Sequence, residues 1–197
     1  MPDLLFSIPV GPDPDPDSAP SSEVAPTPEE PMWRPVEGNP NAISVNLGAA
    51  MVQPYPGLKP GWVMGREKGQ VILELRDDGE LYENGRKLVF YFPRRGRYEL
   101  SGWQFWHEML LTLHCGTHPN VKTALMANKH LIPKTGARDA EGRRRYIYFW
   151  ERGFENNYGS YGVYMYCNDQ GEWEESFRSL HLDTWNDRCP VLVREAV

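Results

Sequence analysis

The sequence predicts an α+β fold, in which an antiparallel β-sheet made of a meander and a C-terminal hairpin packs on one main α-helix. Three observations lead to this prediction: two hairpin dipeptides six positions apart, a helix start with a complete capping pattern, and two tyrosine-rich runs in the last third. A length of 197 residues with 40% hydrophobic residues suits one ordinary domain. We expect a single α+β domain over residues 41–197, preceded by a disordered, acidic, proline-rich arm over residues 1–40.

The arm is predicted from its charge and its prolines. Residues 1–40 hold eight acids against Arg34 alone, a net charge of −7, and eleven of the eighteen prolines. The other nineteen acids and twenty bases leave the remainder nearly neutral. Fixed φ angles and charge repulsion favour an extended segment that cannot fold alone. Two apolar islands, with Leu5 and Phe6 in one and Trp33 in the other, are predicted to anchor the arm on the body or on a partner; a plain solvated linker is the alternative.

The strands follow from alternation and turn residues. NAISVNLG reads as a short first strand, and residues 70–92 predict a three-stranded meander with turns at Asp78-Gly79 and Asn84-Gly85. RYIYFWER and SYGVYMYCN predict a hairpin, and CPVLVREA predicts a terminal strand. EWEESFRSLHL fits no single element.

The main helix is expected to begin at Ser101 and Gln104, which match the capping-box pattern, and to run to about residue 115, where Gly116 stops it. Residues 119–131 suit either a second, shorter helix or a strand.

The same region holds the only residues that suggest a metal. WHEMLLTLHCGTH, at 106–118, could bring His114, Cys115 and His118 together at the helix end, given a carboxylate from elsewhere. His107 and His114 are seven positions apart, which places them about 10 Å apart along a helix, too far to share one ion. The helix dipole gives His114 a simpler role. We therefore expect no metal and no cofactor, and keep a metal-dependent hydrolase as an alternative.

The predicted C-terminal hairpin carries an aromatic face. Tyr146, Tyr148 and Trp150 alternate with Ile147 and Phe149 on the first strand, so the two sets point to opposite sides. On the second strand, Tyr164 and Tyr166 share a face. A row of tyrosine and tryptophan is typical of recognition surfaces. The alternative is an ordinary core beneath the helix at 102–114.

A basic patch is predicted beside this face. It consists of arginines that follow the meander or precede the hairpin: Arg94, Arg95, Arg97, Arg143, Arg144 and Arg145. Arginines beside exposed rings can hold single-stranded nucleic acid, and neighbouring asparagines would suit a carbohydrate. Because the body is nearly neutral, a protein partner is favoured over nucleic acid. The acidic arm could itself occupy these arginines within the same chain.

Taken together, these features predict a non-catalytic interaction, assembly or accessory protein, of a kind that includes viral ones, using the arm and the aromatic hairpin as contacts. No GxSxG, P-loop or GxGxxG motif supports an enzyme. The chain shows no secretory signal pattern and no apolar run of membrane-spanning length, so we expect a cytoplasmic protein, in the host cytosol or the virion if viral, with no membrane partner.

Overall fold

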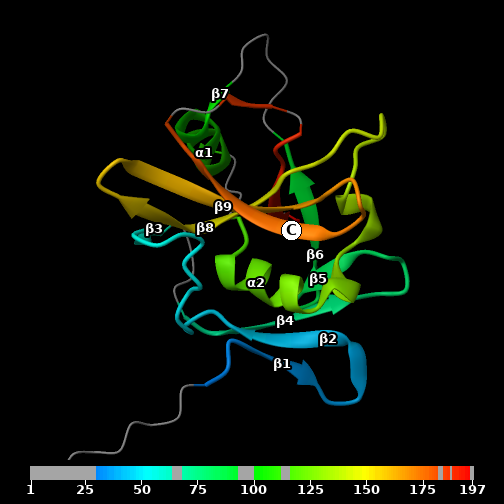
Figure 1. Cartoon of the computed structure of the whole chain (residues 1–197). Helices are drawn as coiled ribbons and strands as arrows, with labels where there is room; N and C mark the ends of the chain where they lie inside the picture. The colour runs from blue at the N-terminus through cyan, green and yellow to red at the C-terminus, as the bar shows by residue number, and fades with distance from the viewer. Residues whose placement is uncertain are drawn as a thin grey trace, which may run out of the picture.

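The computed structural model describes residues 30–63, 68–92, 100–111, 116–181, 184–186 and 188–195. This part of the chain is 46% strand and 17% helical, so the protein is mainly β. The long sheet curls into a half-barrel that holds one short helix in its concave side and carries another on its outside (Figure 1).

The elements, in chain order, have the following bounds. The strands are β1 Trp33–Val36, β2 Asn39–Asn46, β3 Lys59–Val63, β4 Gln70–Leu75, β5 Leu81–Glu83, β6 Arg86–Tyr91, β7 Leu100–Ser101, β8 Ile147–Asn156, β9 Gly159–Cys167, β10 Trp173–Ser179, β11 Thr184–Trp185 and β12 Val191–Arg194. The helices are α1 Gly102–Leu111 and α2 Pro119–Ala127, with 3₁₀ turns at Lys129–Leu131 and Lys134–Gly136.

The α+β prediction is wrong in two respects. The large sheet has the order β1-β2-β4-β5-β6-β12-β8-β9-β10, with β3 added to β8, and β12 runs parallel to β8, so the sheet is mixed and not antiparallel. Two short helices replace the single main helix. The physical reason is that the C-terminal strand inserts between the meander and the hairpin, joining them into one sheet. No local pattern specifies that insertion.

The local predictions within the sheet agree with the structure. β4, β5 and β6 form the meander, with Leu73 opposite Glu83 and Tyr82 opposite Lys87. Asn84 and Gly85 have φ angles of 50° and 77°, the left-handed conformation that a two-residue hairpin turn requires. β8 and β9 form the expected hairpin, and β10 extends it.

The helix starts are set by side chains. The Gln104 amide N–H donates to Ser101 Oγ at 3.3 Å, and Gln104 Oε1 accepts from the Ser101 amide at 2.8 Å, so the predicted capping box is present at α1. α2 begins beyond His118, whose Nδ1 accepts from the Asn120 amide at 3.0 Å. Each helix therefore has its own start signal, which explains why two short helices form here.

Two apolar clusters lie on opposite faces of the sheet. The inner cluster lies in the concavity around α2, and Ile147 and Phe149 of β8 point into it. The outer cluster lies under α1 and takes Tyr148 and Trp150 from the same strand. Figure 1 shows α1 and α2 on opposite sides of the β8–β9 hairpin. Both faces of β8 are consequently buried.

The sheet also includes residues that the composition places in the arm. β1 pairs with β2, with Trp33 opposite Val45, and the half-buried Trp33 side chain packs against the inner cluster. Trp33 therefore anchors the chain on its own body. The other predicted anchors, Leu5 and Phe6, lie outside the described residues.

Candidate functional site

An apolar pocket opens from the inner cluster beside β6. Its volume is about 310 Å³, within the range of roughly 300 to 1,000 Å³ that is usual for ligand pockets. Its apolar lining residues come from β5, β6, α2, the loop after α2, and the hairpin and terminal strands: Leu81, Leu88, Val89, Phe90, Phe92, Leu125, Ile132, Pro133, Ile147, Met165 and Leu192. The polar lining residues are Glu80, Lys87, Thr135 and Arg145.

The pocket exists because several segments meet without filling the space between them. Leu125, at the end of α2, is fully buried and forms part of the pocket wall. The chain then turns through Leu131 and Ile132 and passes Pro133 before returning toward β8. Proline has no N–H to pair and fixes its φ, which suits a loop that leaves the helix beside a sheet. The pocket is therefore bounded by the sheet on one side and by this loop on the other.

Arg145 is one of the three charged residues that line the pocket, and its side chain lies against two aromatic rings. Its guanidinium carbon lies 5.4 Å from the Phe90 ring centroid and 5.5 Å from that of Phe92, within cation–π range. Arg145 Nη1 donates to the Thr135 carbonyl oxygen at 2.9 Å, whereas the buried Nε has no hydrogen-bond partner among the described residues. Among the residues that the structure describes, no acid pairs with Arg145. The mouth therefore presents a cation whose charge no acid among the described residues offsets.

A second cation at the mouth is already paired. Lys87 Nζ lies 3.4 Å from Glu80 Oε1. Partial burial of the Lys87 amine lowers its pKa, but the hydrogen bond and the negative charge of Glu80 outweigh that effect, so the pKa of Lys87 is raised above its ordinary value. Lys87 is thus a charged neighbour whose charge Glu80 offsets, which leaves Arg145 as the stronger attraction for an anion at this mouth.

The aromatic hairpin is divided between core and rim. Tyr148 and Trp150 have an exposed fraction of 0%, and each packs on Trp185, with ring centroids 4.0 Å and 4.6 Å away. Burial raises the pKa of Tyr148 well above its ordinary value. The helix α1 covers this part of the face through Phe105. Tyr148 and Trp150 therefore pack inside the protein, and a partner could reach them only after α1 moved away.

The other three tyrosines are half-buried. Tyr146 contacts both Tyr164 and Tyr166, with ring centroids 5.7 Å away in each case. Tyr166 donates to Glu174 Oε2, and this hydrogen bond raises the pKa of Tyr166 while lowering that of Glu174. Arg144 lies above the Tyr166 ring at 5.3 Å. The three half-buried tyrosines therefore contact one another, Glu174 and Arg144 within the same chain.

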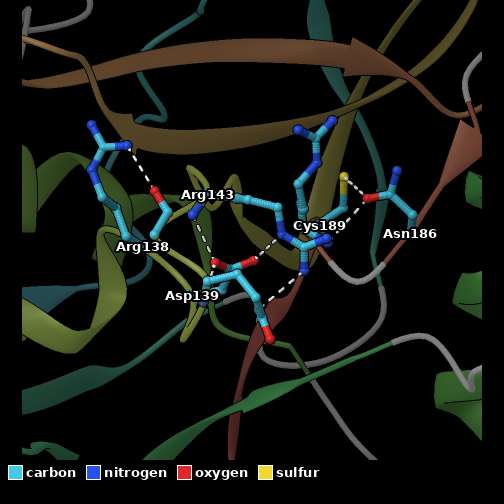
Figure 2. A network of polar contacts seen from close by, with 8 residues as sticks. Arg138, Asp139, Arg143, Asn186 and Cys189 are labelled. Carbon is cyan, nitrogen blue, oxygen red and sulfur yellow. Dashed lines mark hydrogen bonds and ion pairs between the residues drawn. The ribbon is translucent and has the colours of Figure 1, made fainter.

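Two arginines of the predicted basic patch, Arg143 and Arg144, are ion-paired. Arg143 Nε lies 2.6 Å from Asp139 Oδ2, and Figure 2 shows this side chain pointing at Asp139. Arg144 lies 2.9 Å from Asp169, and hydrogen bonds from Arg144 and Arg138 hold the pKa of Asp169 below its ordinary value. These contacts offset the charges of Arg143 and Arg144. Arg94, Arg95 and Arg97 lie outside the described residues.

Metal ligands do not converge in the described part of the chain, where no group of three His, Cys, Asp or Glu side chains could hold an ion. His118 is fully buried and caps α2. His114 and Cys115 lie outside the described residues. Two other cysteines, Cys167 and Cys189, are buried and form no disulfide among the described residues. Cys189 contacts Asn186 in the network of Figure 2, and burial raises its pKa, which lowers the share of the thiol present as thiolate.

Sequence reasoning found Arg145 but not the pocket beside it. The lining residues are spread from Glu80 to Leu192, and each belongs to a segment that looks like an ordinary buried strand or helix. The sequence feature that pointed toward the pocket is the run of three arginines before β8. A partly buried arginine at the start of a strand is stabilised by a counter-ion or by an aromatic ring. Only the fold shows that Arg145 differs from Arg143 and Arg144.

Comparisons with known proteins add no assignment: no family model, no curated protein and no solved structure matches this chain. Among the described residues, no helix combines the length and the apolar character needed to cross a membrane.

Proposed function

We propose that this chain is a non-catalytic interaction protein, of the accessory or assembly type, whose pocket beside β6 binds an apolar segment of a protein partner flanked by acidic residues. The observation that carries the proposal is the pairing of an apolar pocket with Arg145, a cation without an acid partner among the described residues. An apolar segment would fill the pocket, and a carboxylate beside it would reach the guanidinium.

The chemistry of the lining supports binding. Eleven of the fifteen lining residues are apolar, and two of the polar ones, Lys87 and Glu80, pair with each other. A pocket of this type gains affinity from apolar burial and specificity from a few polar groups. The arginines next to Arg145 are ion-paired, which argues against extended contact with a polyanion and for one localised anion.

The test is an array of apolar seven-residue peptides that carry either acidic or basic flanks, measured against the full-length protein. Acid-flanked peptides are expected to bind at least tenfold more tightly than basic-flanked ones, and Arg145→Glu is expected to remove or reverse that preference. Arg143→Glu is the matched control, because Arg143 is two residues away and does not line the pocket. Equal binding of both peptide classes, or equal effects of the two variants, would contradict the proposal.

A further inference from the structure

This chain itself contains a segment whose composition suits the apolar pocket. Residues 4–10, LLFSIPV, are apolar except for Ser7, and GPDPDPD follows them directly, so Asp13, Asp15 and Asp17 come within seven positions of the apolar run. The order of the two parts suits a pocket with a cation at its mouth, because the apolar side chains can enter while the aspartates remain outside, near Arg145.

We infer that residues 4–10 occupy the pocket of their own chain, so that a protein partner must displace them to bind. This inference rests on the proposed function, since it assumes that the pocket accepts an acid-flanked apolar segment. It also gives the acidic stretch a role: the negative charges of residues 13–17 are held close to an arginine that has no acid partner among the described residues.

The connection is long enough for this contact. The described chain begins at Glu30, just before β1, and nineteen residues separate Glu30 from Val10. A proline-rich segment of that length spans up to about 60 Å in a polyproline conformation, and about 24 Å as a random coil. β1 and β6 are four strand spacings apart in the sheet order, which corresponds to about 19 Å. Residues 4–10 can therefore reach the pocket.

The tether also favours the same chain over a second copy. A segment joined by a linker of this length reaches an effective concentration in the millimolar range near its own body. At micromolar protein concentration, a segment from another molecule is far more dilute. Exchange between chains becomes competitive only where molecules are crowded together, as in an assembly.

A cysteine trap tests the contact directly. In the full-length protein, Phe6→Cys is combined with Thr135→Cys, which places a thiol on an exposed residue at the pocket mouth. The control combines Phe6→Cys with Tyr158→Cys, because Tyr158 is 91% exposed and follows the end of β8 opposite to Ile147, which lines the pocket. A strand of ten residues spans about 30 Å. Under mild oxidation the first pair is expected to form a disulfide within the monomer at least tenfold faster than the control. Equal rates, or disulfides only between chains, would overturn the inference.

Competition separates this inference from the proposed function. A fluorescent peptide of residues 1–17 is titrated into the wild-type protein and into the Leu5→Asp/Phe6→Asp variant, whose own segment can no longer enter an apolar pocket. The variant is expected to bind the peptide at least tenfold more tightly, and adding Arg145→Glu to it should reverse the gain. Equal affinity for both proteins would show that the pocket is not self-occupied, which overturns the inference but not the proposed function. Failure of this peptide and of the whole acid-flanked array would overturn both.

Discussion

At Gly162, on β9, the absence of a side chain makes room for a tryptophan. A Cβ atom at this position would lie 2.4 Å from Trp150 Nε1, far inside van der Waals contact. The indole cannot move away easily, because Phe105 and Trp185 hold it, with ring centroids 5.2 Å and 4.6 Å away. The outer cluster therefore depends on glycine at this position for its packing and not for its backbone conformation.

Gly162→Ala is accordingly expected to lower the free energy of unfolding by about 1 to 3 kcal/mol, the usual cost of overpacking a well-filled core. Chemical denaturation followed by tryptophan fluorescence measures this directly. Gly48→Ala is the control, because a Cβ there would make only an ordinary contact with Asn46 Oδ1 at 3.4 Å on an exposed turn. If both variants were as stable as the wild type, Trp150 would not be packed as described.

Among the single elements, the start of α1 is stabilised by the hydroxyl of Ser101. Ser101 Oγ accepts the Gln104 amide, which would otherwise be one of the unpaired donors at the helix start. Ser101→Ala is expected to cost about 1 kcal/mol of stability, and Ser101→Thr should restore most of it because threonine keeps the acceptor. Thermal or chemical denaturation of the three proteins checks this; equal losses for alanine and threonine would assign the effect to β7 instead of the cap.

The contact between α2 and β10 depends on a buried lysine. Lys122 has an exposed fraction of 2%, and its amine pairs with the half-exposed Glu175. Glu175→Gln removes the counter-charge while leaving the ammonium buried, so a loss of about 1.5 to 3 kcal/mol is expected. Adding Lys122→Met should recover part of that loss, because methionine fills the site without a charge.

A double-mutant cycle on these two positions measures the coupling. Glu172→Gln serves as the control, because this exposed side chain forms no ion pair among the described residues. Additive effects of the two substitutions would mean that Lys122 and Glu175 do not interact in solution.

For the whole molecule, the sequence predicted structure that depends on neighbouring residues, but not the pairing of segments far apart in the chain. Asn84-Gly85 and Ser101 with Gln104 act over a few residues, and the meander and the start of α1 follow from them. The alternation along β8 correctly separated Tyr148 from Phe149. The insertion of β12 depends on segments far apart in the chain, where loop closure and packing decide and no short pattern is informative. The burial of Tyr148 under α1 agrees with the alternative, a core beneath this helix, which the sequence left open beside a recognition surface.

The same distribution of contacts bears on how the protein unfolds. β8 supplies Ile147 and Phe149 to the inner cluster and Tyr148 and Trp150 to the outer one, so neither cluster can lose this strand without exposing the other. Two cores that share a central strand are expected to unfold in a single transition. The half-barrel and the layer under α1 should therefore melt together.

This expectation can be tested with the tryptophans. Trp62, Trp103, Trp106, Trp150 and Trp185 belong to the outer cluster, whereas Trp33 and Trp173 pack on the inner one. In a Trp33→Phe/Trp173→Phe variant, fluorescence reports the outer layer alone and far-UV circular dichroism reports mainly the sheet. Coincident midpoints in denaturant are expected, because both signals follow the loss of β8. A fluorescence midpoint clearly below the dichroism midpoint would mean that α1 and its tryptophans detach first, which would expose Tyr148 and Trp150 to a partner after all.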